Sequence, residues 1–354
     1  MKLHPIQKLF FSLGTLILAV VVMWYGAFLL IPICYAIILG IVINPVLTYL
    51  QSKLKSHFLA YLISIIGVLL LIFIPFGVVT DQLQSLFSEL EMDSIGIEKV
   101  TSSIQQTLIE TRLSTVIDLD MLKSQMDKVL GFLGTFVQSI LSGSGHMLVN
   151  FALAIVFSYF FSAYYRDTKK IILAELQSEE RKKWRKIARQ APNIIRSYLS
   201  GMLIVMAILA VLNSLALLII GIKYAFVWGL IIGMLAIIPY AGTFIGLMLP
   251  LSYSFISSND YKQPLAIIIC YIVIQQIEGN FLTPKIVGDK LNVNPFIIIV
   301  MILLFGKIWG IDGVIISLPL IGVVKAILQE YPGGQLLAEI ISSKEAQNQE
   351  KSNS

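Results

Sequence analysis

Charged residues are scarce in this sequence. Asp, Glu, Lys and Arg make up 13% of its 354 residues, against about 25% in an ordinary soluble domain. Hydrophobic residues make up 57%, and the mean hydropathy is +0.84. So few charges could not cover the surface of a soluble protein of this size. The composition therefore excludes a soluble domain and predicts an integral membrane protein.

Cysteine and the usual catalytic signatures are also nearly absent. The two cysteines, Cys34 and Cys270, both lie inside apolar runs, which does not support a disulfide framework or a cysteine metal site. The sequence has no phosphate-binding P-loop, no HExxH zinc motif and no GxSxG nucleophile elbow. We therefore expect no enzyme activity, no cofactor and no bound metal.

The chain contains long apolar runs instead. A helix needs about 20 apolar residues to cross a bilayer. The clear candidates for transmembrane helices are residues 9–31, 33–50, 58–80, 146–165, 197–221 and 264–282. The first run is too long for the apolar region of a signal peptide, so we expect it to be retained. It meets the second run at Pro32 with almost no loop, which predicts a tight hairpin.

Two polar segments predict the orientation. Residues 81–145 carry nine acidic and four basic residues, with apolar positions at helical spacing, and predict amphipathic helices. Residues 166–196 carry ten basic and four acidic residues. Basic loops remain cytoplasmic, so we expect 166–196 and both termini inside and 81–145 outside. The basic run also suits an anionic leaflet, so membrane lipids are expected partners and nucleic acid is not.

Two further apolar stretches are interrupted. Residues 225–257 are broken at Pro239-Tyr240-Ala241-Gly242, where proline removes a backbone donor and glycine permits irregular backbone. Residues 295–328 are broken between Gly306 and Gly313 by three glycines and two opposite charges. The two halves of the first stretch cover roughly 20 Å each, short of a ~30 Å hydrocarbon core. Irregular backbone at that depth must be buried in protein or face a watery cavity.

Each broken stretch has two topologies open to it. It is one interrupted span, or it is a re-entrant hairpin that turns back at its break. Hairpins would place Lys285 and Lys290 inside and Lys223 and Lys262 outside, which the charge count modestly favours. Two hairpins that enter from opposite faces would bring their tips near the midplane, as in transporters with inverted repeats. The predicted fold is therefore all-α and polytopic, with about six full transmembrane helices, two re-entrant hairpins and a small external helical segment.

Polar residues in and beside these segments form the candidate site. Gln275, Glu278 and Asn280 cluster at the end of the 264–282 helix. Glu278 either pairs with Lys285 at the interface or belongs to a substrate or coupling-ion site with the hairpin tips. The whole candidate site comprises Pro239, Tyr240, Gly242, Gln275, Glu278, Asn280, Pro284, Gly306, Lys307, Gly310, Asp312 and Gly313.

Two further interpretations concern single residues. Lys307 and Asp312 could form a structural ion pair across the second break. Asn213, within the 197–221 helix, predicts an interhelical hydrogen bond.

The chain thus divides into five expected parts. They are N-terminal transmembrane helices at 1–80, an external segment at 81–145, a fourth helix with a basic cytoplasmic helix at 146–196, a transport core with two hairpins at 197–330, and a cytoplasmic polar tail at 331–354.

A run from Gln276 to Gly288, QIEGNFLTPKIVG, resembles the signature of the AI-2E family of transporters, also called the autoinducer-2 exporter or PerM-like family. Ile238-Pro239-Tyr240 with Gly242 and Gly246, Asn292–Pro295, and Gly306–Pro319 are similar to it as well. The resemblance covers nearly the whole chain. It implies an inner-membrane protein counted as eight membrane segments. It also implies a homo-oligomer, a pentamer, whose protomers move substrate by an elevator-like motion of the hairpins.

Three functions stay open. Members of the family are associated with export of autoinducer-2, which implies a secondary exporter of a small polar molecule. Others are associated with sodium or lithium exchange for protons, and Glu278 or Asp312 would then be the titrating carboxylate. A non-transporting membrane scaffold is the third function, but it does not explain the two glycine-rich breaks.

Overall fold

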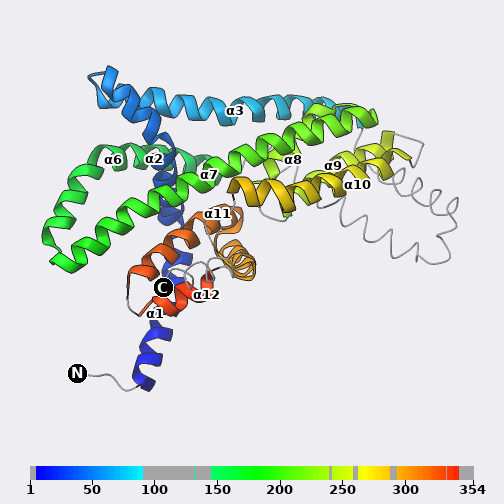
Figure 1. Cartoon of the computed structure of the whole chain (residues 1–354). Helices are drawn as coiled ribbons and strands as arrows, with labels where there is room; N and C mark the ends of the chain where they lie inside the picture. Colours follow the sequence, from blue (N-terminus) through cyan, green and yellow to red (C-terminus); the bar gives the residue numbers. More distant parts are fainter. Residues whose placement is uncertain are drawn as a thin grey trace. The chain divides into compact units, whose positions relative to one another are not determined.

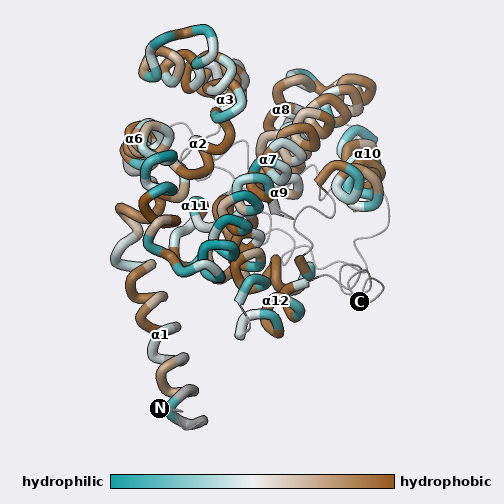
Figure 2. Tube along the Cα trace, turned by 60° about the vertical axis from the view of Figure 1, so that its left-hand side comes forward, coloured by the Kyte–Doolittle hydropathy of each residue, from teal (hydrophilic) through white to brown (hydrophobic). Residues whose placement is uncertain are grey.

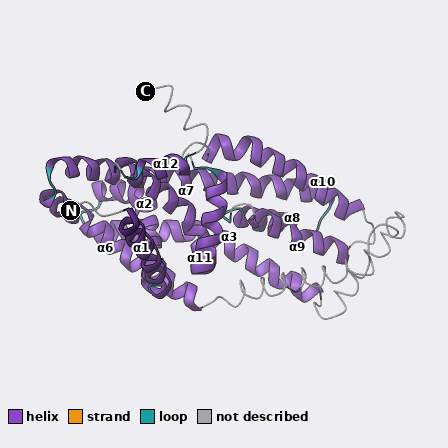
Figure 3. Cartoon of the chain, turned by 90° about the horizontal axis from the view of Figure 1, so that it is seen from below, coloured by secondary structure: helices purple, strands orange, loops and turns teal. Residues whose placement is uncertain are grey.

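The computed structural model describes residues 5–90, 131, 145–238, 241–257, 262–287, 293–331 and 333–342. Within these residues every regular element is a helix, as Figure 3 shows, and the one β feature is a single bridge between Val293 and Ser342. The all-helical prediction is therefore confirmed. The external segment expected at 81–145 lies mostly outside the described residues, and so does most of the tail beyond Ser342.

The helices belong to two compact units. The first unit is drawn from Met1–Ile66, Gly145–Leu199 and Asp289–Ser354, and the second from Gly67–Ser144 and Ser200–Gly288. In chain order the elements, labelled in Figure 1, are α1 (Pro5–Tyr25), α2 (Ala27–Lys53), α3 (His57–Leu90), α6 (Gly145–Glu175), α7 (Ser178–Ile220), α8 (Ala225–Leu235), α9 (Ala241–Ser257), α10 (Lys262–Ile277), the π-helix η2 (Glu278–Val287), α11 (Pro295–Glu330) and α12 (Gln335–Ile341).

Four of the described helices are long and apolar enough to cross a membrane. They are α2, α7, the continuous helix Lys262–Val287, and α11. Shorter apolar helices occur at His57–Leu71, Ala225–Leu235 and Gly242–Phe255. In Figure 2 the polar beginning of α7 and its apolar remainder are distinguished by colour. This pattern is that of a multi-pass membrane protein, and the count of eight segments stays a prediction.

The predicted hairpin at Pro32 is wrong. Pro32 lies buried inside α2, and the break between α1 and α2 falls at Gly26. Helical hydrogen bonds continue across the break, from the Gly26 N–H to the Val22 carbonyl (2.8 Å) and from the Leu30 N–H to the Gly26 carbonyl (2.9 Å). Figures 1 and 2 both show α2 continuing onward from α1 instead of returning beside it. Pro32 removes only one helical hydrogen bond, and apolar membrane helices tolerate that loss.

Polar and aromatic side chains join α3 to α6. The Tyr61 hydroxyl donates a 2.7 Å hydrogen bond to the Ile155 carbonyl, and Tyr61 packs edge to face on Tyr159. His57 Nε2 lies 3.3 Å from Ser162 Oγ one turn away. Hydrogen bonds between membrane helices stabilise their association by about 0.6 kcal/mol each on average. This row therefore helps to fix α3 on α6 within the first unit.

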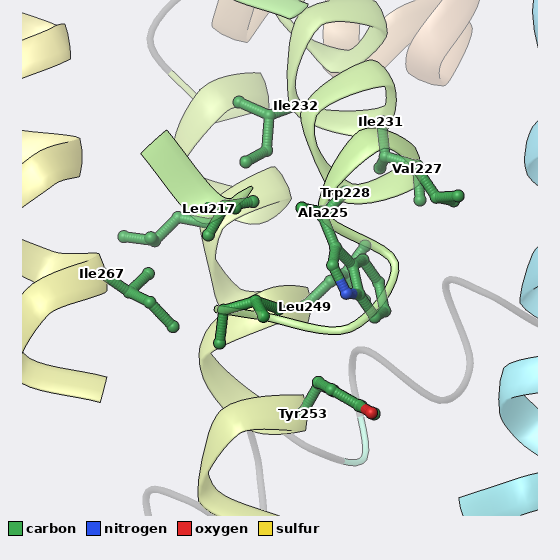
Figure 4. Close-up of a cluster of buried hydrophobic side chains, with 11 residues drawn as sticks. Leu217, Ala225, Val227, Trp228, Ile231, Ile232, Leu249, Tyr253 and Ile267 are labelled. Atoms are coloured by element: carbon green, nitrogen blue, oxygen red, sulfur yellow. The ribbon is translucent and has the colours of Figure 1, made fainter. Parts of the chain in front are cut away.

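Residues 225–257 form a helical hairpin. The rings of Trp228 on α8 and Tyr253 on α9 lie 5.9 Å apart between centroids. A Cβ atom on Gly246 of α9 would lie only 2.9 Å from the Cα atom of Ile232 on α8. Figure 4 shows Trp228 and Tyr253 within one buried apolar cluster, to which α10 contributes Ile267. The two halves of the broken stretch therefore lie side by side.

Glycines spaced four residues apart allow this close packing. Gly229 and Gly233 of α8 face α7, where a Cβ on Gly229 would collide with Ser214 and one on Gly233 would lie 2.6 Å from the Ala210 Cβ. Membrane helices use such small residues to bring their backbones together, because apolar side chains alone give no preference for helix over lipid. Hence the backbone of α8 packs closely against α7 at these two glycines.

Residues 295–330 form a second hairpin. A straight helix of 36 residues would be about 53 Å long. Yet the Asn294 N–H, at its start, donates a 2.8 Å hydrogen bond to the carbonyl of Ile341. The eleven residues from 331 to 341, seven of them in α12, can reach only about 25 Å. The two ends of α11 must therefore lie on the same side, which they do because the helix folds back at Gly310.

Candidate functional site

The second hairpin turns at Gly310. Its backbone has φ 62° and ψ −140°, a region that essentially only glycine enters. Three residues later a Cβ on Gly313 would collide with the Phe305 carbonyl, and one on Gly306 would lie 3.1 Å from a methyl group of Val314. Each of the three predicted glycines thus has its own steric reason. Gly310 supplies the turn, and Gly306 and Gly313 let the two halves touch.

The tip of this hairpin is fastened to α1 and α2 by two hydrogen bonds. The Tyr35 hydroxyl donates to Asp312 Oδ1 over 2.8 Å. The indole N–H of Trp309 donates over 2.8 Å to the carbonyl of Met23, just before the kink at Gly26. Bending of a helix frees carbonyls near the bend for outside partners. The kink that replaces the expected Pro32 hairpin therefore provides an acceptor for the tip.

Asp312 and Lys307 do not form the ion pair that the sequence suggested. Asp312 accepts its hydrogen bond from Tyr35 instead, and Lys307 is exposed. The charges still suit their positions, because Lys307 lies in the last turn before Gly310 and Asp312 in the first turn after it. A cation at a helix C-terminus and an anion at an N-terminus are each stabilised by the helix dipole.

The polar cluster of the second unit lies where α10 becomes η2. Gln275 Nε2 donates a 2.8 Å hydrogen bond to Glu278 Oε2, and both side chains are half-buried. Asn280 Nδ2 donates to Gln276 Oε1 over 2.8 Å, and both are exposed. Gln275 and Glu278 therefore form one polar group, while Asn280 lies apart from it.

Glu278 does not pair with Lys285, as it would if the cluster were only a helix end at the membrane interface. The Lys285 ammonium lies over the Phe281 ring instead, 5.9 Å from its centroid. Pro284 lies between them in η2 and has no N–H to bond to the carbonyl four residues back. A switch to π-helix is one way to accommodate such a gap, and π segments are frequent at functional sites.

Two residues that the sequence did not single out join this polar group. Tyr271, one turn before Gln275 on the same face of α10, places its hydroxyl 3.5 Å from Thr243 Oγ1 of α9, at the outer limit of a hydrogen bond. Thr243 is buried directly after Gly242, at the tip of the first hairpin. The spacing Tyr271, Gln275, Glu278 is i, i+4, i+7, which could have identified Tyr271. We call Thr243, Tyr271, Gln275 and Glu278 the polar row.

Geometry places the polar row beside and beyond the first tip. Gln263 near the start of α10 bonds to Ser254 near the end of α9 (3.1 Å), whereas Tyr271 approaches Thr243 at the start of α9. The two helices are therefore antiparallel. Glu278 follows Tyr271 by seven residues, which carries it about 10 Å past the level of Thr243.

Tight backbone packing also shapes the tip itself. A Cβ on Gly242 would collide with the carbonyl of Leu235, the last residue of α8. The Gly242 N–H donates to the Ile238 carbonyl over 2.9 Å. Pro239 and Tyr240, both predicted site residues, lie outside the described residues.

Asn213 does not make the interhelical bond expected of it. Its side-chain amide donates a 2.8 Å hydrogen bond to the Leu209 carbonyl, one turn earlier in α7. A buried amide in a membrane helix must satisfy its donors, and its own helix supplies the nearest acceptor.

Two apolar helical hairpins, each with polar groups at or beside its tip, resemble the discontinuous helices with which many membrane transporters build their substrate sites. The sequence pattern of the AI-2E family transporter matches residues 13–333. The chain belongs to the AI-2E transporter family. The match to this family takes in both hairpins, the polar row and the Tyr35–Asp312 contact.

Curated relatives agree with this membership. The candidate transport protein YueF of Bacillus subtilis is 27% identical over 307 residues, which cover 84% of this chain and 83% of YueF. The AI-2 transport protein TqsA of Escherichia coli is 30% identical over 121 residues, covering 34% of this chain and 35% of TqsA. The candidate permease PerM of Escherichia coli is 25% identical over 162 residues, covering 44% of this chain and 43% of PerM. As an AI-2E family member the chain is a multi-pass membrane transporter, consistent with the lack of enzyme motifs.

Proposed function

We propose that this AI-2E family protein is a secondary exporter of a small polar molecule such as autoinducer-2. The observation that carries the proposal is the polar row beside the first hairpin tip. Polar and ionisable side chains inside membrane segments are costly to insert, so they commonly mark a substrate or ion pathway. Here four of them share one track along α9, α10 and η2.

The chemistry of the polar row suits a neutral, hydroxyl-rich cargo. Thr243 and Tyr271 offer hydroxyls, Gln275 offers an amide and Glu278 offers a carboxylate. Together they supply both donors and acceptors at several points, as a small polyol or furanone would require. The name of the relative TqsA gives AI-2 as its cargo, which supports this class of molecule for the present chain.

The transport motion in this proposal is elevator-like and uses the two hairpins. Each hairpin has a close-packed glycine at or beside its tip and a base that is tied to neighbouring helices. The N-terminus of α9 lies at the first tip and that of the second half of α11 at the second. Helix N-termini offer unpaired N–H groups and a partial positive charge to a polar cargo.

A Na⁺(Li⁺)/H⁺ antiporter is the second candidate. The observation that favours it is the presence of Glu278 and Asp312, one carboxylate at each hairpin region, since an antiporter needs a site that alternates between cation and proton. A non-transporting scaffold would need neither carboxylate nor the glycine-built tips.

The proposal includes a location and an assembly. We place the chain in the bacterial inner membrane as a homo-oligomer, with the basic 166–196 segment and the C-terminus in the cytoplasm. Because α2 continues from α1 at Gly26, the two helices count as one crossing where the sequence predicted two. If α2, α3 and α6 each cross once, the N-terminus then lies outside, against the cytoplasmic side that Lys2 and Lys8 favour. Cysteines introduced at Lys262 and Lys290 should label from outside and inside respectively if the hairpins are re-entrant.

Transport assays separate the candidates. Purified protein is reconstituted into liposomes. The liposomes are loaded with autoinducer-2, or with a pH-sensitive dye under an imposed sodium gradient. We expect autoinducer-2 efflux, reduced at least tenfold by Glu278→Gln. Glu175→Gln, which removes an exposed carboxylate from α6, is the matched control and should transport normally.

The other outcomes are equally informative. Sodium-dependent proton movement without autoinducer-2 efflux would replace the exporter by the antiporter. If folded, oligomeric protein shows neither autoinducer-2 efflux nor proton movement, the scaffold is favoured. Normal transport by Glu278→Gln in whichever assay responds would remove the polar row from the mechanism.

A further inference from the structure

The basic segment of α7 carries a row of arginines on one face. Arg189 and Arg196 follow Arg185 by four and eleven residues, which at 100° per residue places all three within about 40° around the helix. They extend over about 16 Å of the helix axis. We call Arg185, Arg189 and Arg196 the arginine row.

Most of the neighbouring bases are already engaged within the protein. Ion pairs join Lys170 to Asp167 (3.6 Å), Lys182 to Glu179 (3.0 Å) and Lys186 to Glu330 (2.6 Å), while Lys169 and Lys183 lie over the Tyr165 and Tyr331 rings, and Arg181 donates to the carbonyls of Ala174 and Leu176. The arginine row has no such partner among the residues that the structure describes.

Arg196 shows most clearly that an acceptor is needed. Its Nε atom, like that of Arg181, is buried and has no hydrogen-bond partner within the described part of the chain. Arg181 is held through its Nη2 nitrogen by backbone carbonyls, whereas Arg196 has no hydrogen bond or ion pair among these residues. A buried donor without an acceptor costs about 1–3 kcal/mol, so such atoms usually have a bound water, ion or ligand nearby. A guanidinium also binds phosphate oxygens in a two-pronged geometry that lysine cannot reproduce.

The position of the row in the helix identifies the source of the phosphate. α7 passes without a break from the basic segment into its apolar span, which carries no charged residue after Arg196. Arg196 therefore lies where an apolar helix leaves the hydrocarbon core, at the level of lipid headgroups. Arg189 and Arg185 lie about 10 and 16 Å farther along the helix.

We propose that the arginine row is a binding site for the phosphate of an anionic phospholipid, with Arg196 as its central contact. The site is separate from the polar row and does not depend on which cargo is transported. Electrostatic attraction falls off over about 10 Å at 0.1 M salt, so the contribution of each arginine should decline from Arg196 to Arg189 to Arg185.

Binding is measured on the full-length protein in detergent micelles, by native mass spectrometry and by titration with phosphatidylglycerol or phosphatidylcholine. We expect preferential retention of phosphatidylglycerol. Near a membrane surface one basic residue is worth about fivefold in affinity, so Arg196→Gln should lose about that much, Arg189→Gln less and Arg185→Gln least. Lys170→Gln, which removes an already paired charge, should bind as the unmodified protein does.

A second variant keeps the test valid if Arg196→Gln does not fold. Arg196→Lys retains the charge but has no Nε donor, and it should show a smaller loss than Arg196→Gln. The proposal is overturned if all arginine variants bind phosphatidylglycerol as tightly as the unmodified protein, or if Lys170→Gln loses as much affinity as they do. Either result would show that the lipid responds to the overall positive charge of the segment and not to a specific site. Displacement of phosphatidylglycerol by equimolar inorganic phosphate would replace the lipid by a free anion, and tighter binding of duplex DNA than of lipid would also overturn it.

Discussion

The Tyr35 hydroxyl donates a 2.8 Å hydrogen bond to the carboxylate of Asp312, and so joins α2 to a residue 277 positions later in the chain. Asp312 lies two residues after Gly310, where the second hairpin turns. Trp309 makes a parallel contact to the backbone of Met23. The second hairpin is therefore held at its tip as well as at its base.

Removing the Tyr35 hydroxyl should loosen this tip. Tyr35→Phe and Asp312→Ala should each lower the thermal midpoint of the detergent-solubilised protein, by the equivalent of about 0.5–2 kcal/mol. Because both changes break one hydrogen bond, the double variant should be hardly less stable than the worse single variant. Strictly additive losses would show that the two side chains act independently.

The loss of stability when a glycine is replaced by alanine should depend on the space around that glycine. Gly313→Ala and Gly242→Ala place a methyl group on a backbone carbonyl, so we expect losses of more than about 2 kcal/mol and poor yields of monodisperse protein. Gly279→Ala meets nothing within 4 Å and is the control, with an expected change near zero. Gly310→Ala has room but the wrong backbone conformation, at a cost of about 1–3 kcal/mol.

A disulfide should form across the base of the second hairpin. Val293 and Ser342 face each other in an antiparallel bridge, where Cβ atoms lie about 4.5–5.5 Å apart, within reach of a disulfide after a small shift. In a chain whose Cys34 and Cys270 are replaced by serine, Val293→Cys with Ser342→Cys should cross-link under mild oxidation. The pair Val293→Cys with Leu304→Cys is the matched control, because Leu304 lies in the first half of α11, about 14 Å along the helix from its start. Absence of the first cross-link would restore the interrupted-span topology.

Tyr271 should affect transport more than stability. Tyr271→Phe removes a hydroxyl whose only described partner lies at the 3.5 Å limit, so its loss should cost little unfolding free energy. If that hydroxyl contacts cargo, efflux should fall by about tenfold, with a raised half-saturation concentration. Ser257→Ala, which removes an exposed hydroxyl from the other end of α9, is the control for an effect of hydroxyl loss alone. Unchanged efflux by Tyr271→Phe would limit the site to Gln275 and Glu278.

The sequence was most informative where local chemistry dictates the structure. Gly310 marked the second turn because few other residues permit its backbone conformation, and Gly242 marked the close backbone contact with Leu235 at the first. It could not decide between hairpin and span, since both need the same break, and the decisive contact pairs Asn294 with Ile341. That pairing depends on where α12 packs, which no periodicity reveals.

Errors arose where a residue has two acceptable environments. Pro32 marks a helix break in water, but within an apolar helix it costs one hydrogen bond, and Gly26 bends the chain instead. Asn213 needed an acceptor and found it in its own helix. Tyr35 and Thr243 gave no signal at all, because one hydroxyl in an apolar run acquires meaning only from the partner that the fold brings to it.

The bridge between Val293 and Ser342 sets the order in which this protein can be built. Residue 293 leaves the ribosome 49 positions ahead of its partner. The second hairpin must therefore enter the bilayer with its base untied and wait for α12 before that base can be fastened. A translation arrest after Glu330 would leave an inserted but unfastened intermediate, and such a nascent chain should be cut at the hairpin base by a protease that the finished protein resists.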